Sequence, residues 1–75
     1  MTDIQSFIQD EVKILAFKKV EINESLIKSK LLDSITLVEL LVVIEEKTGK
    51  TFPQHMINEE YLDTISMICN VLETL

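Results

Sequence analysis

The pair Asp33-Ser34 is where this 75-residue sequence comes closest to a site for covalent chemistry. It stands directly before a dense apolar run that starts at Ile35, and Asp or Ser in that position is typical of a helix N-terminus. The free backbone N–H groups and the dipole of such a terminus favour an attached phosphate on Ser34, by up to about 1 kcal/mol at an exposed site. Because the same pair is far more often only a helix cap, it needs support from its surroundings.

The other reactive side chains do not combine into an enzyme or metal site. The chain has a single histidine, His55, and a single cysteine, Cys69. A side-chain nucleophile needs an activating base, and a zinc site needs several Cys or His ligands, so we expect neither catalysis nor a bound metal. His55 fits an ordinary surface position in a loop. Cys69 fits a buried apolar position, as Met56 and Met67 do.

The acidic residues are concentrated in the second part of the chain. Residues 1–32 hold five acids and five lysines, whereas residues 33–75 hold eight acids and two lysines and so carry the whole formal net charge of −6. An acidic protein repels nucleic-acid phosphates and anionic lipid headgroups, so we expect basic proteins as partners and no nucleic acid. The alternative explanation is that the acidity only keeps a small protein soluble.

The spacing of apolar residues predicts an all-α fold, a small four-helix bundle with a short third helix and a long first loop, as one domain over residues 1–75. The low content of glycine and proline, one of each, suits helices. Thr2 and Gln5 fit a capping box at the first helix. The expected helices cover residues 3–17, 34–48, 59–62 and a last segment that begins after Asp63-Thr64, and residues 18–33 form the loop.

Helical geometry divides the expected helix over residues 34–48 into two faces. Leu37, Leu41 and Ile44 fall together and are expected to face the core. Opposite them stand acids and aliphatic side chains, a combination that is common on docking surfaces. The alternative is that so small a bundle buries this helix nearly all round. The members of the outward side are Ile35, Glu39, Val42, Val43 and Glu46, with Glu45 nearer its edge.

The residues around the Asp-Ser pair resemble the prosthetic-group attachment site of acyl carrier proteins, in which Asp-Ser-Leu is followed by a Val-Glu-Leu-like stretch on one helix. The corresponding sequence here is Leu31-Leu32-Asp33-Ser34-Ile35-Thr36-Leu37-Val38-Glu39-Leu40. Further family-like features follow in order, namely Glu45-Glu46, Gly49, Phe52-Pro53 and Asp63-Thr64-Ile65. The resemblance covers residues 31–75 by motif and residues 1–30 by length and helix pattern only.

This resemblance implies that Ser34 carries 4′-phosphopantetheine through a phosphodiester, and that acyl groups are carried as thioesters on its terminal thiol. Asp33 would position the site for a phosphopantetheinyl transferase and its metal ion. The protein itself would perform no catalysis. By the same resemblance, acyl-loading and acyl-processing enzymes would dock their basic patches on Ile35, Glu39, Val42, Glu45 and Glu46.

The resemblance also implies that the acyl chain enters the helical core. The expected lining of that acyl-chain core is Phe7, Leu37, Leu41, Ile44, Ile65, Ile68 and Leu72. A cytoplasmic location is expected, because Met1-Thr2-Asp3 opens without a basic and apolar leader. The protein is also expected to be a monomer. No apolar stretch nears the roughly 20 residues of a membrane span.

Two departures from the family pattern leave the cargo and the partners open. Lys30, Leu31 and Leu32 occupy the stretch where carriers usually have a glycine. Thr36 stands where many fatty-acid carriers have an acid. Fatty-acid, polyketide or specialised lipid biosynthesis is the expected pathway. An aminoacyl or peptidyl carrier, including a D-alanyl carrier, is the first alternative, and an unmodified acidic helical interaction module is the second.

Overall fold

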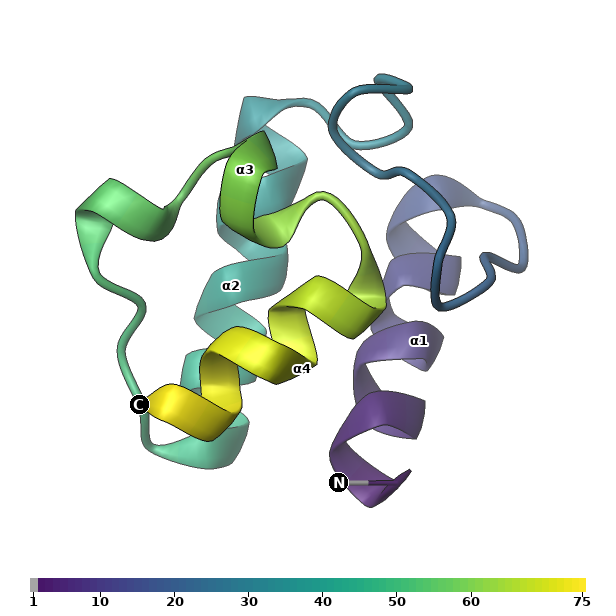
Figure 1. Cartoon of the computed structure of the whole chain (residues 1–75). Helices are drawn as coiled ribbons and strands as arrows, with labels where there is room; N and C mark the ends of the chain where they lie inside the picture. Colours follow the sequence, from purple (N-terminus) through teal and green to yellow (C-terminus); the bar gives the residue numbers. More distant parts are fainter. Residues whose placement is uncertain (1) are drawn as a thin grey trace.

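Four α-helices and one 3-10 turn form the regular structure of the protein, which a computed structural model describes from residue 2 to residue 75. No strand occurs over these residues, so the predicted all-α class is confirmed. Helix α1 packs against both α2 and α4, and Figure 1 shows α4 running across the molecule from the α1 side toward the C-terminus. The elements are α1 (Thr2–Ala16), α2 (Ser34–Thr48), η1 (Gln54–Met56), α3 (Glu59–Leu62) and α4 (Ile65–Thr74).

The helix ends follow the local chemistry of the sequence. Helix α2 begins after Asp33, whose carboxylate accepts a hydrogen bond from the Thr36 backbone N–H. It ends at Gly49, which takes the left-handed backbone with φ 72°. Helix α1 ends one residue earlier than predicted, because Phe17 adopts a left-handed backbone with φ 60°. The capping box predicted at Thr2 involves a side chain outside the described residues.

The core is mostly aliphatic, includes the ring of Phe52, and draws on all four helices and on the long loop. Phe7, which is predicted to line the acyl-chain core, is half-buried and packs against the buried cluster, with Lys47 Nζ 5.3 Å from its ring centroid. Ile8 and Val12 are the fully buried residues of α1. The other six residues of the predicted acyl-chain core are buried as expected: Leu37, Leu41, Ile44, Ile65, Ile68 and Leu72.

Residues 17–33 form a long loop without helix or strand. Val20, Leu26 and Leu32 are buried, which confirms that apolar residues of the loop fill the core. Figure 1 shows the last part of the loop beside the start of α2, at the end of the molecule where α3 also lies. Hydrogen bonds to other parts of the chain fix its path, among them Gln9 Nε2 to the Val20 carbonyl (2.7 Å), Ser66 N–H to the Ile22 carbonyl (2.9 Å) and Leu26 N–H to the Asp63 carbonyl (2.6 Å).

Candidate functional site

Asp33 is the cap of α2, as its position in the sequence suggests. Its Oδ1 accepts hydrogen bonds from the Thr36 backbone N–H (2.8 Å) and from the Thr36 hydroxyl (2.6 Å). The hydroxyl bond and then the backbone bond lower the pKa of the Asp33 carboxyl, because both stabilise its charged form. Asp33 is therefore an exposed carboxylate that holds the first turn of α2 in place.

Ser34 is the first residue of α2, and its side chain is exposed. Its hydroxyl takes part in none of the side-chain hydrogen bonds found over residues 3–75, since Asp33 already serves as the cap. The first backbone N–H groups of α2 lie at the same end. Ser34 thus offers an accessible oxygen at a helix N-terminus, where an attached phosphate is favoured.

A groove of about 380 Å³ opens beside Ser34, and we call it the α2 groove. Three parts of the chain contribute to it: the end of the long loop, the start of α2 and the segment that leads into α3. Leu37 is the one residue of the predicted acyl-chain core that lines it, so sequence reasoning missed most of its apolar surface. The lining residues are Ile27, Leu32, Asp33, Ser34, Leu37, Ile57, Asn58 and Glu59.

Asn58 fixes the α3 side of the α2 groove. Its Oδ1 accepts a hydrogen bond from the Glu60 N–H (2.8 Å), and its Nδ2 donates to the His55 carbonyl (2.9 Å). Asn58 is therefore the cap of α3, as predicted. Glu59 follows it in the lining, so the groove combines aliphatic side chains with two carboxylates, those of Asp33 and Glu59.

The outer face of α2 exposes aliphatic side chains to solvent. Ile35 is 72% exposed, Val38 52% and Val42 47%. Glu39 and Glu46 are exposed on the same helix. The sequence leaves open whether this helix has an exposed side or is buried nearly all round, and the structure shows an exposed side. Val38 also belongs to that side, although the sequence analysis did not include it. We define the outer face of α2 as Ile35, Val38, Glu39, Val42 and Glu46.

Two residues predicted on the outward side of this helix are partly buried. Glu45 is half-buried, and its Oε2 accepts a hydrogen bond from the Phe52 backbone N–H at 2.8 Å. Glu45 thereby anchors the loop that carries the buried ring of Phe52. Val43 is also half-buried. The docking role of Glu45 stays a prediction, beside a structural role that the sequence did not indicate.

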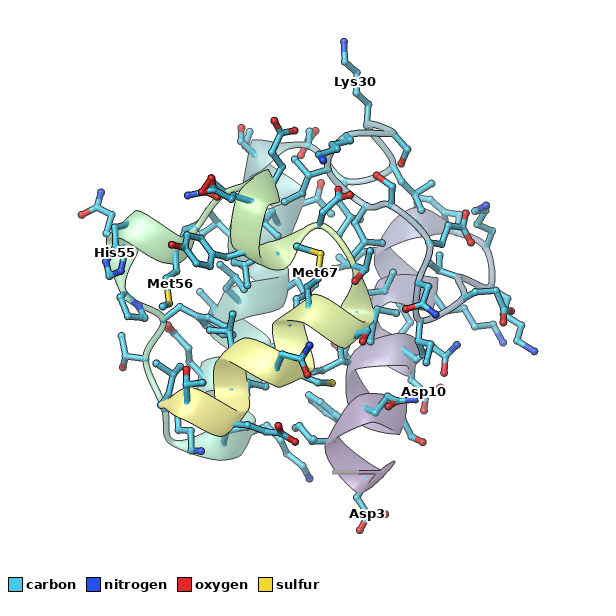
Figure 2. All side chains as sticks on the ribbon, in the orientation of Figure 1. Asp3, Asp10, Lys30, His55, Met56 and Met67 are labelled. Carbon is cyan, nitrogen blue, oxygen red and sulfur yellow. The ribbon has the colours of Figure 1, made fainter. Side chains whose placement is uncertain are left out.

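The other reactive side chains form no second site over residues 3–75. His55 is exposed and meets Tyr61 edge-on, with ring centroids 6.3 Å apart. Cys69 is buried, as predicted, and burial raises the pKa of its thiol. Met56 and Met67 are half-buried on η1 and α4 (Figure 2). In the described part of the chain, no three His, Cys, Asp or Glu side chains lie close enough to hold a metal ion.

Comparisons of the chain with protein-family models, curated protein sequences and solved structures each found no match. None of the helices described over residues 2–75 is long and apolar enough to span a membrane. Three features of the structure itself bear on function. They are the free Ser34 hydroxyl, the α2 groove beside it and the outer face of α2.

Proposed function

We propose that this protein is a carrier of the acyl-carrier type, which bears 4′-phosphopantetheine on Ser34 and delivers acyl intermediates to enzymes of fatty-acid, polyketide or specialised lipid biosynthesis. The observation that carries the proposal is the accessible, unpaired Ser34 hydroxyl at the start of α2, beside a largely aliphatic groove. The resemblance of residues 31–40 to the attachment site of carrier proteins supports the same role. The short α3 and the long first loop suit an acyl-carrier bundle.

The residues at the start of α2 fit a phosphodiester on Ser34. The Ser34 oxygen would bond to the phosphorus of an activated phosphopantetheine donor while the bond from that phosphorus to the donor's leaving phosphate group breaks, and the Ser34 proton would pass to a base of the transferase. The N-terminal N–H groups of α2 would stabilise the negative charge of the diester. Asp33, held by Thr36, keeps the first turn in shape, and its exposed carboxylate would be available to the metal ion of a phosphopantetheinyl transferase. Once attached, the group supplies a thiol that carries acyl chains as thioesters.

The outer face of α2 suits contacts that form and break quickly. A carrier must reach several enzymes and leave each one, so long-range attraction with a small apolar contact serves it better than tight binding. The two glutamates of this face attract basic patches, and its three aliphatic side chains supply the apolar contact. Glu45 contributes only in part, because its carboxylate also binds the Phe52 N–H.

The α2 groove supports an aliphatic cargo. A chain that leaves water for such a lining gains roughly 0.8 kcal/mol for each buried CH₂. A medium-length acyl group on the arm should therefore raise the melting temperature above that of the unacylated holo form, and should shift the NMR signals of Leu37 and Ile57, which line the groove. If neither quantity changes, an aminoacyl or another polar cargo becomes the better candidate.

An unmodified acidic adaptor is the second candidate, because the outer face of α2 is complete without any group on Ser34. Intact mass after co-expression with a broad-specificity phosphopantetheinyl transferase separates the two functions. A carrier gains the mass of one phosphopantetheine, whereas an adaptor gains nothing. Ser34→Ala should abolish the gain, and Ser29→Ala, which removes another exposed hydroxyl five residues earlier, should retain it. Modification that survives Ser34→Ala would place the site elsewhere.

A further inference from the structure

We propose that Asp63 is a positioning residue that sets the width of the α2 groove, by tying the loop wall of the groove to the end of α3. The inference rests on the proposed function only for the identity of the cargo. The link itself is argued from the burial of Asp63, its hydrogen bonds and the place of their donors in the groove.

Asp63 is the one charged side chain that is buried over residues 3–75, with 7% of its surface exposed. A buried carboxylate is costly unless hydrogen bonds compensate it. Burial has the largest single influence and by itself would raise the pKa of Asp63. The backbone N–H groups of Lys28 and Ile27 and the Ser25 hydroxyl together outweigh it, so the pKa is lowered. The carboxylate therefore remains charged in the folded protein and binds its donors strongly.

All the donors to Asp63 come from one short segment of the loop. Its Oδ1 accepts hydrogen bonds from the Ser25 hydroxyl, the Ile27 N–H and the Lys28 N–H, each at 2.9 Å. The backbone carbonyl of Asp63 accepts another from the Leu26 N–H at 2.6 Å. Four consecutive residues of the loop are thus bound to one residue, which fixes both the position and the orientation of the segment.

This segment belongs to one wall of the α2 groove. Ile27 lines the groove directly, and Leu32 lines it further along the loop, with its N–H donating to the Leu26 carbonyl at 2.9 Å. The other wall starts at Ile57 and leads through the four residues of α3 to Asp63. Because four helical residues rise only about 6 Å, Asp63 is a short and stiff link between the two walls. Figure 1 shows both walls at the same end of the molecule.

A purely stabilising role for Asp63 makes a different prediction from a positioning role. If Asp63 only contributes to stability, its loss should change the α2 groove of the folded protein no more than another destabilising substitution does. Val12→Ala provides that comparison, because Val12 is fully buried on α1 and does not line the α2 groove. Truncating a buried aliphatic side chain lowers stability without removing any link between loop and α3. A positioning role instead requires a change in the groove that Val12→Ala lacks.

The experiment uses the unmodified full chain at a temperature where every variant is folded. Methyl NMR shifts of Leu37 and Ile57 report the groove without ligand, and octanoate serves as the aliphatic probe for affinity. Asp63→Ala should move both methyl signals and weaken octanoate binding at least about fivefold, while Val12→Ala should do neither. Asp63→Asn keeps an acceptor oxygen and should recover most of the affinity. Ser25→Ala removes one donor and should give a smaller change in the same direction.

Equal shifts and equal octanoate affinities in Asp63→Ala and Val12→Ala would overturn the proposal. If Asp63→Ala does not fold, Ser25→Ala decides in its place, and wild-type methyl shifts with wild-type octanoate affinity in Ser25→Ala would overturn the proposal as well. Wild-type protein that does not bind octanoate would count against an aliphatic cargo, while the ligand-free shifts would still decide the role of Asp63. The carrier function itself is tested separately, by the mass gained on Ser34.

Discussion

Helices α2 and α4 start with nearly the same residues, Asp33-Ser34-Ile35 and Asp63-Thr64-Ile65, but the chain uses them in opposite ways. At α2 the aspartate is the cap and the serine hydroxyl is free. At α4 the threonine is the cap, with its Oγ1 accepting from the Met67 N–H at 3.0 Å, and the aspartate binds the distant loop. One start therefore leaves an exposed hydroxyl without a hydrogen-bond partner, and the other uses a carboxylate to hold tertiary structure.

Burial explains why the two starts differ. Asp33 is exposed, and its carboxylate binds a local N–H, that of Thr36 three positions later. Asp63 is buried against the loop, and its donors lie 35 to 38 positions away in the sequence. A helix-start motif thus predicts that a helix begins, whereas the surroundings decide which of its side chains stays available for function.

The two aspartates should differ most in their contribution to stability. Asp63→Ala should lower the free energy of unfolding by about 3 kcal/mol, because it removes hydrogen bonds between a charged group and partly buried donors. That is a large share of the stability of a chain of this size. Asp33→Ala should lower it less, because water can replace the bonds of an exposed cap. Urea titrations of both variants measure the difference, and equal losses would remove the distinction between the two helix starts.

Acid should remove the contribution of Asp63 to stability. The pKa values of both carboxyls are lowered in the folded protein. Such a group stabilises the fold fully above its ordinary pKa of 3.8, and this contribution is lost as the pH falls through the lower folded-state value. Thermal melts should show a decline below about pH 4 that is shallower in Asp63→Asn than in wild type. An acid decline that Asp63→Asn leaves unchanged would contradict the role assigned to this carboxylate.

Thr64 and Ser34 should differ in opposite ways, since Thr64 matters for stability and Ser34 for modification. Thr64→Ala should lower stability by about 1 kcal/mol, because it removes the cap of α4, and it should leave modification of Ser34 intact. Ser34→Ala should change stability by less than about 0.5 kcal/mol while abolishing modification. Urea titration and intact mass on the same samples measure both properties. A large stability loss in Ser34→Ala would mean that its hydroxyl has a structural role after all.

The smallest effect is expected from the outward surfaces of the two helices. Between α2 and α4, it is α2 that combines exposed aliphatic side chains with several acids, so Glu39→Gln with Glu46→Gln should slow association with a basic transferase about threefold at low salt and flatten the salt dependence. Asp3→Asn with Asp10→Asn is the matched control, since it removes two charges from α1 (Figure 2). Equal slowing in both double variants would assign the steering to net charge alone.

The sequence predicts the local features of the fold well. Helical periodicity and capping residues place α2 at residues 34–48 and α3 at residues 59–62, and Gly49 ends α2 as expected. These features depend on residues within a few positions of one another, and local chemistry is what a sequence pattern contains. The end of α1 was misplaced by one residue, because nothing local marks Phe17 for a left-handed backbone.

The candidate site is only partly predictable for the same reason. Adjacent residues are enough to predict Ser34 as the first residue of α2 and Asp33 as the cap of that helix. The α2 groove instead joins Ile27 and Ile57, which are far apart in the sequence. Asp63 reads as part of a helix start, and only the position of the loop in space reveals its buried role. Glu45 likewise reads as a surface acid until the path of the chain brings the Phe52 N–H to it.

The tether between the loop and Asp63 also has a consequence for the order of folding. Helices form from local contacts in about a microsecond, whereas the Ile27–Asp63 bond must close a chain segment of 36 residues. We predict that the loop docks late, after the rate-limiting barrier, so that Ser25→Ala should unfold faster and refold at the wild-type rate, and slower refolding of Ser25→Ala would contradict this order. Interactions that form after the barrier slow unfolding without speeding folding. Strengthening this tether should thus prolong the lifetime of the folded state and leave the folding rate nearly unchanged.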